Sequence, residues 1–185
     1  LMKHTPIALK AKPWLKYGFS GEDYILMTLH RPSNVDNIDS LKSIIYEVSK
    51  VSNDIPVIFS VHPRTLKNIR QSNISVSKNI NMIDPLPYLE FLGLLSNAKI
   101  ILTDSGGIQE ESTVLQVPCL TLRENTERPI TITKGTNSLI GSNPKSIAPA
   151  INNLLQKEKS HCKIPKYWDG NDASRITEIL INNFN

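Results

Sequence analysis

The stretch AKIILTDSGGIQEE, residues 98–111, decides the fold class. Its first six residues centre on the apolar Ile-Ile-Leu at 100–102 and are typical of a buried strand, and Asp-Ser-Gly-Gly at 104–107 ends that strand. A helix is then predicted to run to Leu115. A strand that leads into a helix in this way exposes backbone N–H groups, which bind phosphate, and glycines let a ligand approach closely. The sequence therefore favours a phosphate site here over a plain glycine-rich connection.

The same alternation of short apolar runs and helical segments continues on both sides of this stretch. The strands are continuous apolar runs, as expected when both faces of a sheet are covered. We therefore predict an α/β fold with a doubly wound parallel sheet and helices on both faces. Strands are predicted at 24–29, 56–61, 80–83, 98–103, 119–122 and 138–140, helices at 38–48, 65–71, 88–95, 106–115, 144–155 and 173–184, a polar loop at 123–137 and an irregular segment at 157–170.

Length and composition limit the class of protein. The chain has 185 residues, of which 39% are hydrophobic, so it can build its own core, and a net charge of +4 suits an anionic small ligand but not nucleic acid. No apolar run is long enough to span a membrane, and the first residues show no secretory signal. Two cysteines favour a reducing, cytoplasmic location. We expect residues 1–22 to be a linker or lead-in and residues 23–185 to form the domain.

Polar residues follow the predicted strands at the edge where such sheets bind ligands. His30 and Arg31 follow the first strand, and His62 and Arg64 follow the second. Arg31, His62 and Arg64 are candidate anion contacts, although a solvated loop would hold similar residues. The polar segment 123–129 is either a solvated loop or a lid that brings an arginine to phosphate. No metal site is predicted, because no group of residues has metal-ligand spacing.

Four segments occur in an order that resembles a known family. They are TLHRPSNVD at 28–36, VHPR at 61–64, TDSGGIQEE at 103–111 and NTERP at 125–129. Together they resemble the non-hydrolysing UDP-N-acetylglucosamine 2-epimerases, over a stretch from about Tyr24 to the C-terminus. The resemblance implies one half of a GT-B architecture, which has two Rossmann-like halves. This chain resembles the C-terminal, UDP-binding half, and the N-terminal half lies outside it.

The resemblance also implies roles for individual residues. The sequence departs from the family's pattern at two places. Ser33 replaces a glutamate that is frequent in relatives. The segment after His62 differs from that of members regulated by their own substrate, which puts such regulation in doubt. The implied roles are His30 as catalytic residue, Ser105, Gly106 and Gly107 at the diphosphate, Glu111 at the ribose, Arg128 at the substrate, Phe91 at the uracil, and Leu86 nearby through its backbone alone.

The implied reaction interconverts UDP-N-acetylglucosamine and UDP-N-acetylmannosamine by elimination and re-addition of UDP, without a cofactor. It would supply N-acetylmannosamine for surface polysaccharides. The carboxylates that move the C2 proton belong to the N-terminal domain, so the isolated chain is expected to be inactive, and the full-length enzyme is expected to be a homodimer. Two alternatives stay open: a sugar-nucleotide domain of a GT-B glycosyltransferase, and a nucleotide-binding module without catalysis.

Overall fold

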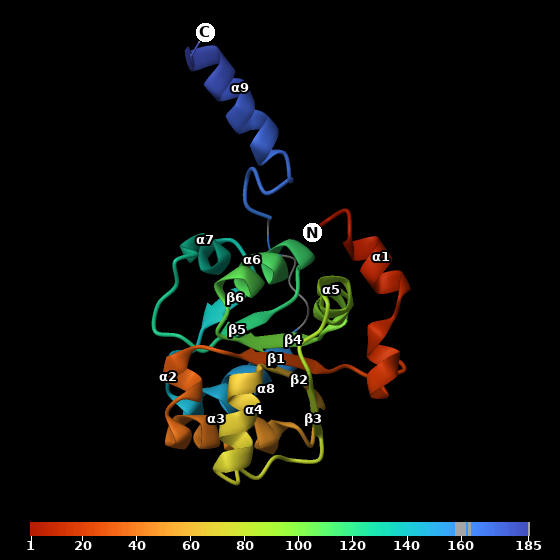
Figure 1. The fold of residues 1–185 in the computed structure, drawn as a ribbon, viewed down its shortest axis with the longest axis vertical. Helices are drawn as coiled ribbons and strands as arrows, with labels where there is room; N and C mark the ends of the chain where they lie inside the picture. The colour runs from red at the N-terminus through yellow and green to blue at the C-terminus, as the bar shows by residue number, and fades with distance from the viewer. Residues whose placement is uncertain (158–161, 163, 185) are drawn as a thin grey trace.

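The computed structural model of the chain describes residues 1–157, 162 and 164–184, and its sheet has six parallel strands (Figure 1). The strand order is β3-β2-β1-β4-β5-β6, which is the Rossmann order and confirms the predicted doubly wound sheet. All six predicted strands are present, and no end differs from its predicted position by more than two residues. Their bounds are β1 Ile25–Leu29, β2 Val57–Val61, β3 Ile80–Ile83, β4 Ile100–Thr103, β5 Cys119–Thr121 and β6 Asn137–Leu139.

Helices cover both faces of this sheet. In Figure 1, α5 and α6 lie on one side, and α3, α4 and α8 lie on the other. The helices are α1 Thr5–Lys10, α2 Pro32–Val35, α3 Ile38–Val51, α4 Pro63–Gln71, α5 Tyr88–Asn97, α6 Gly106–Leu115, α7 Pro129–Thr133, α8 Ile147–Gln156 and α9 Asp172–Phe184, with 3-10 turns η1 Pro13–Tyr17 and η2 Pro144–Ser146.

The two sides of β1 belong to separate hydrophobic clusters. Ile25, Met27 and Leu29 pack with the cluster that includes α3 and α8, while Leu26 packs with the cluster that includes α5. Successive side chains of a strand point to opposite faces, so a strand covered on both sides is apolar at successive positions rather than at every second one. This burial explains why the central strands are the clearest signals in the sequence.

The first 22 residues, expected to be a linker or lead-in, form α1 and η1, which pack on α5. The contact is close at Gly93 of α5, where an added Cβ would lie 2.6 Å from Pro13 Cγ and 2.9 Å from the carbonyl oxygen of Ala8. Any side chain at this position would push the segment away. The segment is thus attached to the body of the domain.

The end of the chain differs in part from the predicted loops. The predicted polar loop 123–137 contains the short helix α7, which begins at Pro129. The predicted irregular segment 157–170 falls partly on residues 158–161 and 163, which lie outside the described residues. The helix predicted at 173–184 is α9, which begins one residue earlier. In the described part of the chain, no helix is long and apolar enough to cross a membrane.

Candidate functional site

The strand order places a topological switch point between β1 and β4. From β1 the chain winds toward β2 and β3, whereas from β4 it winds toward β5 and β6. Ligands of open α/β sheets bind outside the carboxyl ends of the strands at such a point. Here Thr28 of β1 lies opposite Thr103 of β4, and their hydroxyl oxygens are 2.7 Å apart. The residues that follow, His30 and Asp104, therefore meet at this edge.

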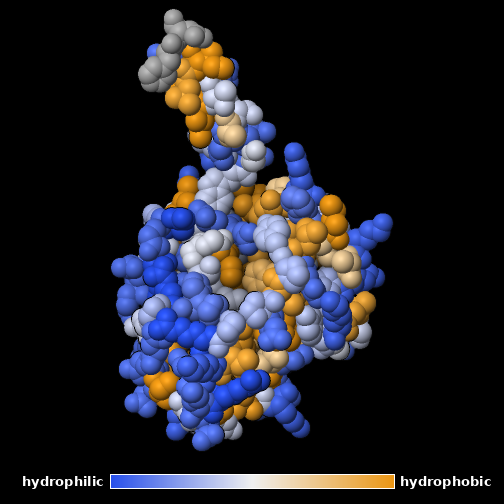
Figure 2. Space-filling model, viewed as in Figure 1, coloured by the Kyte–Doolittle hydropathy of each residue, from blue (hydrophilic) through white to orange (hydrophobic). Residues whose placement is uncertain are grey.

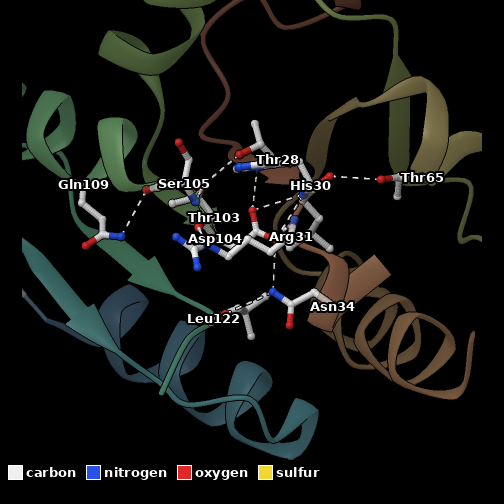
Figure 3. A network of polar contacts seen from close by, with 11 residues as sticks. Thr28, His30, Arg31, Asn34, Thr65, Thr103, Asp104, Ser105, Gln109 and Leu122 are labelled. Atoms are coloured by element: carbon white, nitrogen blue, oxygen red, sulfur yellow. Dashed lines mark hydrogen bonds and ion pairs between the residues drawn. The ribbon is translucent and has the colours of Figure 1, made fainter. Parts of the chain in front are cut away.

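Asp104 is fully buried and lies at the centre of the contacts at this edge (Figure 3). Its carboxylate accepts hydrogen bonds from the backbone N–H of His30 at 3.1 Å and of Arg31 at 2.9 Å. Asn34 donates from Nδ2 at 3.1 Å, and Nδ1 of His30 lies 2.8 Å from Oδ1 of Asp104. Asn34 also donates to the carbonyl oxygen of Leu122, at the end of β5. One carboxylate thus holds the turn after β1 against the ends of β4 and β5.

The N-terminus of α6 begins directly after Asp104. Ser105 is the N-cap residue, and its side chain makes no capping hydrogen bond, while its backbone N–H donates to Thr103 Oγ1 at 3.0 Å. Apart from the adjacent residues and the backbone of α6 itself, no described residue has an atom within 4 Å of the position that a Cβ would take at Gly106 or at Gly107. The first N–H groups of a helix lack partners within the helix, and the helix dipole makes this end positive. The start of α6 can therefore receive an anion close to its backbone.

Glu111 lies one turn further along α6 than Gly107 and is partly buried. Tyr88 of α5 donates a hydrogen bond from its hydroxyl to Glu111 Oε1 at 3.3 Å. Burial raises the pKa of the Glu111 carboxyl above its ordinary value, an effect that the Tyr88 hydrogen bond partly offsets and that neighbouring Glu110 increases. Partial burial makes the charged form of this carboxylate less favourable, and hydrogen bonds from the hydroxyl groups of a ligand would stabilise it.

Arg128 reaches back to the first turns of α6 from the loop after β5. Its Nε lies 2.8 Å from Glu110 Oε1 as an ion pair, although this nitrogen makes no hydrogen bond among the described residues. Nearby, the nearly buried Arg123 donates two hydrogen bonds to Glu127, at 2.9 and 2.6 Å. These bonds lower the pKa of the Glu127 carboxyl to about 2. The loop therefore carries two arginines, each held by a carboxylate.

Gln109, fully buried in α6, connects this loop to the start of α6. Its Nε2 donates to the carbonyl oxygen of Ser105 at 3.1 Å, and its Oε1 accepts from Thr126 Oγ1 at 2.6 Å and from Asn137 Nδ2 at 3.2 Å. Thr126 in turn accepts from the backbone N–H of Arg128 at 3.0 Å. A single amide therefore links Ser105 to the backbone of Arg128.

The three candidate anion contacts already have partners in this structure. Arg31 donates from Nε to the carbonyl oxygen of Asp104 at 3.2 Å. His62 caps α4, where its Nδ1 accepts from the backbone N–H of Arg64 at 3.3 Å. Arg64 pairs with Asp36 at 2.6 Å. Arg31 thus lies at the switch point beside His30, whereas His62 and Arg64 lie at the end of β2.

The two residues expected near a uracil ring lie on the α5 side of the sheet. Phe91 of α5 and Leu86, which precedes α5, are both partly buried and pack against the hydrophobic cluster that includes Leu94 and Ile101. Each therefore offers a partly exposed apolar surface. In the described part of the chain, no group of three or more His, Cys, Asp or Glu side chains could hold a metal ion.

Asp104, Asn34 and Gln109 have no role in the sequence-based prediction. Asp104 could be placed at the ligand-facing edge because it follows β4 directly. Its partner His30 is 74 residues away in the chain, and Gln109 meets Asn137 over 28 residues, so no local pattern indicates these contacts.

Comparison with known proteins gives consistent matches. A family model described as UDP-N-acetylglucosamine 2-epimerase matches residues 2–181. The UDP-N-acetylglucosamine 2-epimerase of Methanocaldococcus jannaschii is 46% identical over 166 residues, which make up 86% of this chain and 44% of that protein. The enzyme of the same name from Escherichia coli K12 is 35% identical over 167 residues, again 86% of this chain and 44% of the relative.

Solved structures agree with these matches. A crystal structure of the Methanocaldococcus jannaschii UDP-GlcNAc 2-epimerase in complex with UDP-GlcNAc and UDP has a TM-score of 0.81 and 41% identity, over 96% of this chain and 52% of that one. The chain thus spans about half the length of the relatives that it matches. Since the family model covers nearly all of its residues, the chain belongs to the UDP-N-acetylglucosamine 2-epimerase family.

Proposed function

We propose that this chain is the UDP-binding, C-terminal half of a non-hydrolysing enzyme that interconverts UDP-N-acetylglucosamine and UDP-N-acetylmannosamine. One observation carries the proposal: the N-terminus of α6 opens at the switch point of the sheet, with free space above Gly106 and Gly107. Ser105 and the α6 backbone would bind the diphosphate, and Arg128 would add positive charge. The relative whose structure contains UDP-GlcNAc and UDP supports this choice of ligand.

The remaining contacts follow from the same placement of the nucleotide. Glu111 would accept hydrogen bonds from the ribose hydroxyls, and Phe91 would lie against the uracil ring, with Leu86 contributing through its backbone. His30 would face the sugar and the bond to UDP. The helix dipole and the arginines stabilise the charge on departing UDP, which is an electrostatic contribution to the elimination step.

We propose that UDP binds without a metal ion, because the helix N-terminus and Arg128 supply positive charge to the diphosphate. Calorimetric titration with UDP in EDTA tests this, with uridine as the ligand control because it lacks the diphosphate. UDP is expected to bind and uridine to bind far more weakly. Loss of UDP binding on chelation would overturn the metal-free assignment, and equal binding of UDP and uridine would overturn the diphosphate site.

The partner of this domain would be the N-terminal half of the longer enzyme, since the chain spans only about half of its relatives. Helix α9 supports this, because it exposes a row of apolar side chains and extends away from the body of the domain (Figures 1 and 2). The exposed residues are Ile176, Ile179, Leu180 and Ile181. Amide hydrogen exchange along α9 should be slower in a protein that contains both halves than in the 185-residue chain. Equal exchange would remove this support.

The activity itself needs both halves. The chain alone is expected not to interconvert the two sugar nucleotides at an enzymatic rate, and a protein with both halves is expected to do so, as followed by NMR of the products. Turnover by the chain alone would mean that the carboxylates for the C2 proton lie here. We further propose a cytoplasmic, homodimeric enzyme that supplies N-acetylmannosamine for surface polysaccharides, and light scattering of the longer protein tests the dimer.

A further inference from the structure

His30 contacts Asp104, a residue to which the proposed reaction assigns no role. The His30 side chain is 49% exposed, whereas the Asp104 side chain is fully buried behind it. The Nδ1 atom of His30 lies 2.8 Å from Oδ1 of Asp104, and the backbone N–H of the same histidine donates to the same carboxylate. Asp104 therefore holds the ring on its buried side, and the exposed part of the ring is accessible to a ligand.

Asp104 can act only as a hydrogen-bond acceptor toward the imidazole ring of His30. Its other partners, the N–H groups of His30 and Arg31 and the amide of Asn34, are all donors. A carboxylate has only acceptor atoms to offer, so a ring nitrogen at 2.8 Å from it must carry a hydrogen. In a neutral imidazole only one nitrogen carries a hydrogen, and the other has a free lone pair.

We propose that Asp104 is a positioning residue that holds neutral His30 as the Nδ1–H tautomer and thereby presents Nε2 to the bound sugar nucleotide. The proposal rests on the proposed function only for the identity of that ligand. Because the turn after β1 is tied to the same carboxylate through two backbone N–H groups, Asp104 fixes the backbone and the ring together. The imidazole thus needs no reorganisation when the ligand arrives.

The tautomer can be measured directly in the 185-residue chain, without activity. Long-range ¹H–¹⁵N correlation spectra of ¹⁵N-histidine-labelled protein distinguish the two neutral tautomers. They would be recorded at about pH 8.5, where an ordinary histidine is neutral. The signals of His30 are assigned by their loss in a His30→Gln variant. We expect the Nδ1–H form for His30, and a predominant Nε2–H form would overturn the proposal.

Two variants separate tautomer control from a merely structural role. Asp104→Asn keeps the size of the side chain but can present an N–H group to the ring, so we expect the Nε2–H form to rise to a major population. Asn34→Ala is the matched control, because it removes one donor to Asp104 and leaves His30 in place; here the Nδ1–H form should persist. An unchanged tautomer in a folded Asp104→Asn protein would overturn the proposal. If that variant does not fold, the wild-type tautomer alone decides.

A protein with both halves provides a second readout. There Asp104→Asn should lower kcat on the order of 100-fold while KM changes little, because a misdirected imidazole affects the transition state more than ground-state binding. A change in KM alone would contradict the proposal. If the wild-type chain did not bind UDP, the proposed function would be contradicted. The tautomer of His30 would still be measured independently of that result.

Discussion

Replacing Gln109 by alanine should destabilise the domain and loosen the loop that carries Arg128. The Gln109 side chain is fully buried and makes three hydrogen bonds, to Ser105, Thr126 and Asn137. A net loss of about 1 kcal/mol for each bond, together with a small cavity, gives about 2–5 kcal/mol in the free energy of unfolding. For a chain of this size, that loss corresponds to a fall in Tm of roughly 4–20 °C.

The assay for Gln109 pairs thermal unfolding with UDP titration. Gln109→Met nearly keeps the volume but removes the hydrogen bonds, so it should also destabilise the domain and should weaken UDP binding through Arg128. Gln71→Ala, in the exposed last turn of α4, is the control and should change stability by less than about 0.5 kcal/mol. The reasoning is refuted if Gln109→Ala unfolds with the same Tm as this control.

Three further predictions concern other residues. Burial raises the pKa of Glu111, so stability is lost as the pH rises from the ordinary pKa of 4.5 up to the raised pKa. Glu111→Gln should therefore raise Tm near neutral pH, lose this gain below pH 4.5, and weaken UDP binding. Ser105→Ala should lower UDP affinity roughly 10- to 100-fold and His30→Ala clearly less, as calorimetry would show. Gly135→Ala would place a Cβ 2.5 Å from the carbonyl oxygen of Thr131, so it should lower Tm in circular dichroism melts, and an unchanged Tm would contradict this reasoning.

The sheet could be predicted from the sequence because its central strands are buried on both faces. This burial makes Ile25–Leu29 and Val57–Val61 mostly apolar segments, with one hydroxyl residue each, which stand out against polar connections. The start of α6 could also be predicted, because the Gly-Gly pair that follows β4 is a local signal of a turn. Helix α7 could not be predicted, since its five residues are too few to show a helical period.

The packing of residues 1–22 could not be predicted either, because few of their side chains are buried. Ala8 and Pro13 contact α5 where Gly93 leaves room, and these small residues give no periodic signal. The contacts of Asp104 likewise join residues far apart in the chain. Local patterns therefore indicated a candidate ligand-binding edge, and the three-dimensional structure was needed to identify the residues whose contacts hold this edge together.

The carboxylates around the start of α6 bear on whether this chain or the N-terminal half would carry out proton transfer. Asp104 is buried among donors, Glu110 pairs with Arg128, and Glu127 is bound by Arg123 with its pKa lowered to about 2. The Glu127 carboxylate, whose negative charge is stabilised by Arg123, is a weak base toward a carbon-bound proton. We therefore propose that these groups shape the anion site and do not abstract the C2 proton of a sugar. The proton-transferring carboxylates would then come from the N-terminal half, and supplying that half should restore turnover without any change to these residues.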